Sequence, residues 1–315
     1  MSQERFVGVD VAKAWLDVAG RPDSTPRRVA NDPDGIAGLV ADLRALAPVL
    51  VVLEATGGLE LPVVAALQVA VVNPRQVRDF AKATGRLAKT DRLDAAVLAH
   101  FAEALRPALS TPVADDVRRL DALLTRRNQL IQMRVMETNR LDRLTDKDVR
   151  ADVTKHVACL TKAIARADAA LAAAVKASPA WRAQDALHQS IPGVGPVATV
   201  TLLAGLPELG TTTGSRLAAL VGLAPFADDS GTRQGGRHIR GGRAPVRRVL
   251  YLAALSAVVH NPAMQAFKAR LAARGKRGKV ILTAVARKLL VVANAIIQSG
   301  QPWRSEVTEP EPISA

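Results

Sequence analysis

Two acidic residues in the N-terminal third of the chain have the spacing of a metal-binding pair. Asp91 and Asp94 are three residues apart in a stretch with helical character, and residues at this spacing share one face of a helix. Mg²⁺ takes its oxygen ligands from several chain segments. Asp10 and Glu54 each end an apolar run typical of a buried strand, where further ligands are needed. These four acids predict one site for Mg²⁺, with Mn²⁺ as the alternative ion.

A hydroxyl group in the C-terminal third is a second candidate for chemistry. Ser230 precedes Gly231 in a segment rich in glycine and arginine. A serine presented there could attack a phosphodiester while arginines stabilise the charge that develops on the phosphate. Its hydroxyl needs a base, which a group at the acidic site could supply. From the residues alone a Ser-Gly pair is more typical of a simple turn, so both interpretations stay open.

The distribution of charge favours a polyanionic partner. The chain has a formal net charge of +14, and residues 231–304 contain fifteen Lys or Arg and no Asp or Glu. This asymmetry favours nucleic acid, although solvated helix faces are the alternative. The residues expected to contact phosphate are Arg233, Arg237, Arg240, Arg243, Arg247, Arg248, Arg287 and Lys288.

A glycine-rich turn is a further candidate for a phosphate contact. The stretch Ile191-Pro-Gly-Val-Gly lies between two predicted helices, as in a helix-hairpin-helix. Glycines at 193 and 195 would let backbone N–H groups approach a phosphate at a helix N-terminus. Gly193 and Gly195 are therefore candidate nucleic-acid contacts, and an ordinary turn between helices is the alternative.

Composition excludes several other classes of protein. Hydrophobic residues make up 49% of the chain, which is enough for two or three domains with cores. An uninterrupted apolar run of about 18 residues and a signal peptide are both missing from the pattern, so we expect a cytoplasmic protein without a membrane partner. A single cysteine, Cys159, can form neither an intrachain disulfide nor a zinc cluster.

The apolar pattern predicts the elements that must position these residues. Strands are expected at 5–10, 14–19, 27–30, 49–54 and 69–72, with helices at 34–46 and 59–67. This order is the plan of an α/β ribonuclease H-like domain, similar to the RuvC-like nucleases, over residues 1–108. Two long helices with a break near 145–150 predict a helical hairpin or coiled coil over 109–180. It either projects to pair with another protomer or packs as two core helices.

The remaining residues complete the predicted domain organisation. Residues 181–305 are expected to form a mainly α-helical domain that contains the helix-hairpin-helix-like turn and the serine. Residues 306–315 are rich in proline and acid, which predicts a disordered tail.

Short motifs along nearly the whole chain occur in an order that resembles the insertion sequence 110 (IS110) family of transposases. The motifs are Asp10-Val-Ala-Lys, Glu54-Ala-Thr-Gly-Gly, Val71-Val-Asn-Pro-Arg, Lys89-Thr-Asp-Arg-Leu-Asp, Ile191-Pro-Gly-Val-Gly, Gly222-Leu-Ala-Pro, Ser230-Gly and Arg287-Lys-Leu-Leu. One departure is the segment 59–68, which is shorter than the helix usual in the family.

The resemblance implies a specific activity. It implies that Asp10, Glu54, Asp91 and Asp94 bind Mg²⁺ and that Ser230 attacks DNA to form a covalent phosphoserine. It further implies donor and target DNA as substrates, a structured bridge RNA as guide, and a dimer or tetramer with composite active sites.

Two other functions remain as alternatives. A RuvC-like Holliday-junction resolvase or nuclease would need only the four acids, with metal-activated water as nucleophile. A non-catalytic nucleic-acid-binding protein would use the acids as helix caps and ion pairs.

Overall fold

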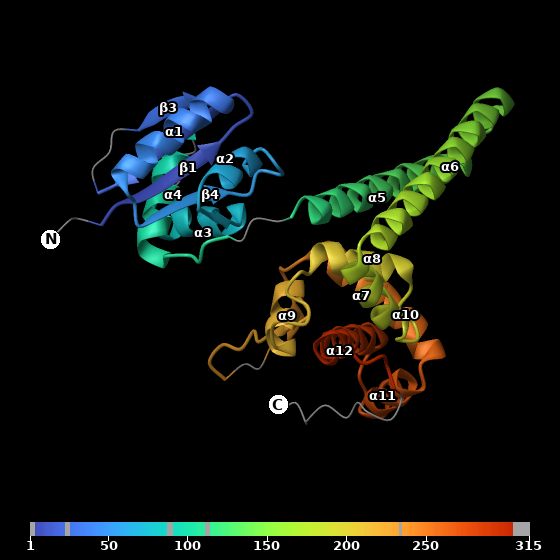
Figure 1. The fold of residues 1–315 in the computed structure, drawn as a ribbon. Helices are drawn as coiled ribbons and strands as arrows, with labels where there is room; N and C mark the ends of the chain where they lie inside the picture. Colours follow the sequence, from blue (N-terminus) through green and yellow to red (C-terminus); the bar gives the residue numbers. More distant parts are fainter. Residues whose placement is uncertain (1–3, 23–25, 87–90, 111–113, 233–234, 305–315) are drawn as a thin grey trace. The chain divides into compact units, whose positions relative to one another are not determined.

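The computed structural model describes residues 4–22, 26–86, 91–110, 114–232 and 235–304, with residues 91–93 described only as part of a helix. The chain divides into two compact units, with the boundary between residues 113 and 114 (Figure 1). Unit 1 is a mixed α/β structure and unit 2 is mainly helical. The predicted tail at 306–315 lies outside the described residues.

Unit 1 is built on a five-stranded sheet in the order β3-β2-β1-β4-β5. The strands are β1 (Phe6–Val11), β2 (Trp15–Arg21), β3 (Arg27–Ala30), β4 (Leu50–Glu54) and β5 (Ala70–Val72). The first three strands form an antiparallel meander, whereas β4 runs parallel to both β1 and β5. The five predicted strands are therefore confirmed, each within two residues of its expected ends.

Helices cover both faces of the unit 1 sheet. Helices α1 (Pro33–Leu46) and α2 (Leu61–Ala66) pack on the face that carries Val7, Val9 and Val51. Helices α3 (Pro74–Ala83) and α4 (Asp91–Leu105) pack on the face that carries Phe6, Leu50 and Val52. Because successive residues of a strand point to opposite faces, the strands β1, β4 and β5 are apolar along most of their length.

Local signals explain where the helices of unit 1 begin and end. The Asp32 side chain accepts a hydrogen bond from the Gly35 amide at 2.8 Å and caps α1, whose first residue is Pro33. The predicted helix at 59–67 is the six-residue α2. Helix α3 was missed, because Asn73-Pro74 reads as the end of a strand, whereas Asn73 caps the helix by accepting from the Arg75 amide.

Unit 2 begins with a long helical hairpin, α5 (Asp115–Leu141) and α6 (Lys147–Ala177), which Figure 1 shows as two paired helices. Asp146 caps α6 by accepting from the amides of residues 148 and 149, which fixes the break near the expected place. The sequence left open whether the hairpin projects or packs as core helices. At its base, Leu120, Leu124 and Leu171 pack with Val200 and Leu203 of unit 2.

The rest of unit 2 is a helical body around one core. Its helices are α7 (Pro179–Gln189), α8 (Pro196–Gly205), α9 (Gly214–Val221), α10 (Ala244–His260), α11 (Pro262–Ala273) and α12 (Gly278–Ser299). Buried residues of α8, α9, α10 and α12 form the core. Two short strands, β6 (Pro225–Phe226) and β7 (His238–Ile239), pair between α9 and α10.

One helix in the described part of the chain, α12, is long and apolar enough to cross a membrane by length and composition. The sequence pattern predicted no membrane span here, because Arg287 and Lys288 interrupt the apolar run. Its residues Val285, Leu289 and Leu290 are fully buried in the core of unit 2. This burial is that of a core helix.

A buried histidine next to α8 makes the stability of unit 2 sensitive to acid. His188 on α7 is fully buried, and neither ring nitrogen has a hydrogen-bond partner among the described residues. It adjoins a cavity of about 40 Å³ that Leu202, Leu206 and Ile297 also line. Burial lowers the pKa of His188 from 6.5 to about 4, although Asp185 opposes the shift. His188 therefore binds a proton less readily in the folded state than in the unfolded state.

We expect the free energy of unfolding to fall as the pH drops from 6.5 towards about 4, the interval between the unfolded and folded pKa of His188. The full loss is on the order of 3 kcal/mol. His188→Leu should remove much of it, because leucine fills similar space without a titratable group. Urea unfolding at about pH 7.5 and about pH 5 measures the difference. The exposed His260→Gln is the control; equal acid sensitivity in His188→Leu and wild type would contradict the assignment.

Candidate functional site

The strand register places two of the predicted metal ligands side by side. Val9 pairs with Leu53 in the parallel β1–β4 ladder, and Asp10 and Glu54 are the next residues along their strands. Both lie on the face that α4 covers, because their side chains alternate with those of Val9 and Leu53 on the opposite face. Asp10 and Glu54 are both half-buried.

Helix α4 brings the third acid to the same place. A Cβ atom on Gly8 would overlap the Ala95 carbonyl and the Ala99 amide, so α4 lies directly on β1 at this glycine. At its other end, Arg106 lies 5.1 Å above the ring of Phe6, which makes the helix antiparallel to β1. From Gly8 to Asp10 the strand advances about 6.6 Å, the length of about four helical residues. The first turn of α4, which includes Asp94, therefore lies over Asp10.

The chemistry of these groups fits Mg²⁺, since carboxylate oxygens are the ligands it prefers. Asp10 and Glu54 lie side by side at one edge of the sheet, and the first turn of α4 lies over the same strand end. Within the described residues, no three acids, histidines or cysteines are close enough to hold an ion as a group. The side chain of Asp91, the fourth predicted ligand, lies outside the described residues. The full four-acid ligand set therefore stays a prediction.

A fifth acid, Asp17, lies in the same row across the sheet and was missed from the sequence. Asp17 pairs with Asp10 across β1–β2 and with Arg28 across β2–β3. It is almost fully buried, and its two oxygens accept hydrogen bonds of 3.0 and 2.7 Å from Arg28. An acid between two apolar strand residues, with an arginine on the next strand, was the available signal. The arginine balances one negative charge beside the candidate metal ligands.

The loop after Glu54 is held by another buried acid, Glu60. One carboxylate oxygen accepts from the Thr56 hydroxyl at 2.7 Å, the Thr56 amide at 3.2 Å and the Gly58 amide at 2.9 Å. Burial opposes ionisation of Glu60, but these hydrogen bonds outweigh it and lower the pKa of the carboxyl below its usual value. The short segment before β5 therefore still gives the Glu54 end of β4 a fixed loop.

The predicted nucleophile, Ser230, is exposed on a long loop between α9 and α10. The short strands β6 and β7 pair within this loop, and the Arg240 guanidinium lies 5.0 Å above the ring of Phe226. Closer to the serine, the Asp229 side chain accepts from the Gly235 amide at 3.0 Å. The hydroxyl is therefore accessible to a large substrate.

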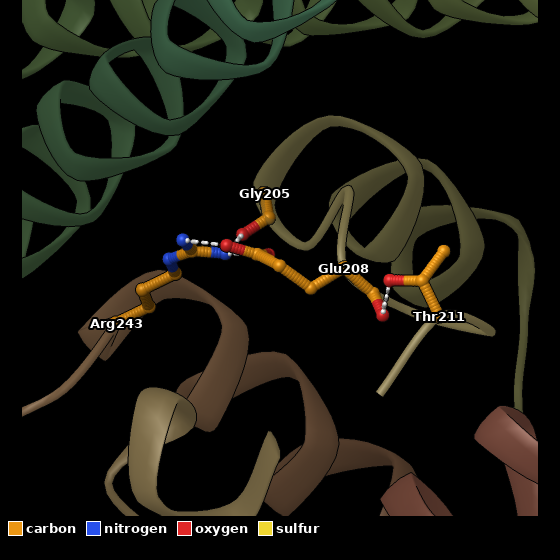
Figure 2. Close-up of polar contacts among 4 residues, drawn as sticks. All are labelled: Gly205, Glu208, Thr211 and Arg243. Atoms are coloured by element: carbon orange, nitrogen blue, oxygen red, sulfur yellow. Dashed lines mark hydrogen bonds and ion pairs between the residues drawn. The ribbon is translucent and has the colours of Figure 1, made fainter. Parts of the chain in front are cut away.

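Two of the predicted phosphate contacts have other roles in the structure. Both terminal nitrogens of Arg243 donate to Glu208, at 2.5 and 2.6 Å, and one also donates to the Gly205 carbonyl at 3.0 Å (Figure 2). Arg247 donates to the carbonyls of Val221 and Gly241. We had expected both to contact phosphate. In the structure, both arginines instead join segments of unit 2, because they donate hydrogen bonds to carboxylate and carbonyl oxygens there.

The other predicted phosphate contacts differ in how exposed their side chains are. Arg237, Arg240 and Arg248 are exposed, whereas Arg287 is half-buried and Lys288 lies 4.8 Å above the ring of Phe267. Arg233 lies outside the described residues. The exposed three therefore remain the best candidates for phosphate contacts.

The glycine turn at 191–195 is present, and packing explains one of its glycines. Gly193 has φ +99°, and a Cβ atom there would lie 2.6 Å from Cα of Ala257 on α10. Gly195 is the exposed N-cap of α8, with open space where a Cβ would be. Gly193 is thus required by helix packing, and a phosphate contact at Gly195 stays a prediction.

A basic turn between α11 and α12 was not singled out from the sequence. Arg274, Lys276, Arg277 and Lys279 are all exposed there, around Gly275 and Gly278. The signal was available in the acid-free segment 231–304, but without a fold nothing distinguished these residues from other cations on helix faces. The turn adds a second exposed basic surface to unit 2.

Comparisons with known proteins connect both units to DNA transposition. A DEDD-type IS110 transposase model matches residues 7–147, and a Transposase IS116/IS110/IS902 family model matches residues 185–269. Pilin gene-inverting proteins of Moraxella bovis and Moraxella lacunata are each 26% identical over 96% of this chain and 99% of their own length.

A third relative matches only part of the chain. The insertion element IS110 uncharacterized 43.6 kDa protein of Streptomyces coelicolor is 34% identical over 121 residues, which cover 38% of this chain and 30% of that protein. The first model covers the acids of unit 1 and continues through α5 of unit 2, and the second lies within unit 2 and includes Ser230. Taken together, the matches show that this chain belongs to the IS110 family of transposases.

Proposed function

We propose that this transposase cleaves and rejoins DNA through a Ser230 phosphoester, with Mg²⁺ held by Asp10, Glu54, Asp91 and Asp94. The observation that carries the proposal is the placement of Ser230, which is exposed on a loop with the exposed arginines Arg237 and Arg240 nearby in sequence. A serine that served only as a turn residue would not need cations around it. The acids at the edge of the unit 1 sheet support the metal part.

The proposed reaction is a pair of transesterifications. Ser230 Oγ attacks the phosphorus, its proton passes to a base, and the bond from phosphorus to the leaving nucleoside oxygen breaks as that oxygen takes up a proton. The hydroxyl of a new strand end then attacks the same phosphorus and releases Ser230. One phosphoester bond replaces another in each step, so no nucleotide cofactor is required. Mg²⁺ would supply Lewis acidity that offsets the negative charge on the phosphate.

The family resemblance extends the proposal to the substrates and partners of the reaction. Donor and target DNA would be the substrates, a structured bridge RNA would select them, and a dimer or tetramer would form composite sites. The cytoplasm would be the place of action. The gene inversion that names the Moraxella relatives is the alternative outcome of the same chemistry, since both rejoin exchanged strands.

A metal-dependent resolvase is the second candidate function. Its support is the edge of unit 1 where Asp10 and Glu54 lie side by side under the first turn of α4, because this reaction would not require Ser230. Water would then be the nucleophile. The two functions differ in whether a protein–DNA bond forms.

Ser230→Ala should abolish the denaturant-stable protein–DNA adduct and leave DNA affinity unchanged, because only the attacking oxygen is removed. The measurement is gel separation of labelled DNA incubated with protein and Mg²⁺, followed by mapping of the attached residue. Ser215→Ala, which changes an exposed serine on α9, is the matched control. Cleavage that survives in Ser230→Ala would favour the resolvase.

Asp10→Asn and Asp94→Asn should each eliminate the increase in melting temperature that Mg²⁺ causes in wild type. Neither should lower the stability of the metal-free protein, because neighbouring carboxylates repel one another without a cation. Calorimetry with increasing Mg²⁺ measures both effects, and Asp34→Asn on the exposed first turn of α1 is the control. Metal-free variants that melt much earlier than wild type would show that these acids are structural.

Arg237→Ala, Arg240→Ala and Arg248→Ala should weaken duplex binding and make it less dependent on salt. Each lost phosphate contact should reduce the slope of log K against log salt by about 0.9. Fluorescence anisotropy over a salt series provides the slopes, and Arg44→Ala on an exposed face of α1 is the control. Unchanged slopes in all three variants would exclude these residues from the interface.

A further inference from the structure

The loop that carries Ser230 is closed at its base by direct contact between backbones. Gly222 has φ +77° and Gly242 has φ +68°. A Cβ atom on Gly222 would overlap the Gly241 carbonyl, and one on Gly242 would overlap the Gly222 amide. The amide of Arg243 also donates to the Leu220 carbonyl at 3.0 Å. The two ends of the loop thus touch, and we call this contact, formed by residues 220–222 and 241–243, the neck.

Two arginines at the start of α10 stabilise the neck. Arg247 joins the two segments of the neck, because one of its nitrogens donates to the carbonyls of both Val221 and Gly241. Arg243 ties the neck to the segment between α8 and α9 through its paired hydrogen bonds to Glu208. That segment is itself fixed, since the Thr211 hydroxyl donates to the Glu208 carbonyl at 2.8 Å (Figure 2).

The charges of Arg243 and Glu208 favour a permanent ion pair. The hydrogen bond from Arg243 is the main cause that lowers the pKa of Glu208 below its usual value, although burial opposes the shift. Glu208 therefore stays charged at neutral pH. No other acid pairs with an arginine of residues 235–304 in the described structure. The segment 231–304 has no acid of its own, so the carboxylate of Glu208, from outside it, distinguishes Arg243 from the exposed arginines of the same loop.

The contacts continue from the neck towards the serine. Past Gly222 and Gly241, the loop pairs β6 with β7, and Arg240 stacks on Phe226. The bond from the Gly235 amide to Asp229 follows, one residue before Ser230. A displacement at the neck would therefore move the hairpin and change the direction in which the hydroxyl is presented.

We propose that Glu208, Arg243 and Arg247 are positioning residues that lock the neck and thereby aim Ser230 at the phosphate. This inference rests on the proposed role of Ser230 as the nucleophile. It assigns the arginines of residues 237–248 to two tasks: Arg243 and Arg247 hold the loop, whereas Arg237, Arg240 and Arg248 are left for DNA.

The test uses Arg243→Lys in the full chain, because lysine keeps the charge but loses the paired fork. Hydrogen exchange by mass spectrometry, without DNA, should show faster exchange across residues 223–242. At saturating DNA, the rate of adduct formation should fall between about ten- and a hundred-fold, because a misplaced nucleophile loses its alignment. DNA affinity and its salt slope should match wild type.

Two further variants keep the result interpretable. Arg140→Lys removes the fork of a pair on α5, Arg140–Glu137 at 2.6 Å, and should change none of the readouts. Arg247→Lys opens the neck without touching Glu208, and should reproduce the faster exchange if Arg243→Lys fails to fold. Exchanging the charges in Glu208→Arg with Arg243→Glu should restore part of the adduct rate that Glu208→Gln loses.

Three results would overturn the inference. A salt slope about one unit shallower in Arg243→Lys, with unchanged exchange, would mean that Arg243 contacts phosphate. Faster exchange with an unchanged adduct rate would make the neck purely structural. If Ser230→Ala still forms the adduct while Arg243→Lys speeds exchange, the proposed function fails and the neck serves only stability, so the two failures are distinguishable.

Discussion

The packing of α4 on Gly8 is the contact on which the acidic site of unit 1 depends. Without a side chain at position 8, the helix lies against the backbone of β1, and its first turn comes over the strand end. The parallel β1–β4 ladder then sets Glu54 beside Asp10. One glycine and one register therefore set Glu54 beside Asp10 and place the first turn of α4 over the same strand end.

Unit 2 applies the same principle to its loop. At the neck, Gly222 and Gly242 let two backbones touch where any larger residue would separate them. Arginines then satisfy the carbonyl and carboxylate oxygens that this contact gathers. In both units, glycine creates the close approach, and polar side chains hold what it brings near. The candidate reactive groups then lie at the strand ends of unit 1 and on a closed loop of unit 2.

The roles of the arginines in the acid-free segment cannot be predicted from the residues next to them in sequence. Arg243 and Arg248 are both basic residues in an acid-free segment, and nothing in their neighbours separates them. In the structure, one is bound to Glu208, which is thirty-five residues earlier, and the other is exposed. Asp17 is the reverse case, since it looks like an ordinary strand residue and lies beside Asp10 through antiparallel pairing.

The sequence by itself determined the five strands of unit 1, the helical hairpin and the position of Asp10 and Glu54 at strand ends. Apolar periodicity and turn residues are local signals, so they can be read along the chain. Only the tertiary structure decided which cations are already paired, why Gly193 cannot carry a side chain, and how the serine loop is closed. These depend on contacts between distant segments, and such contacts leave no pattern in the residues on either side of them.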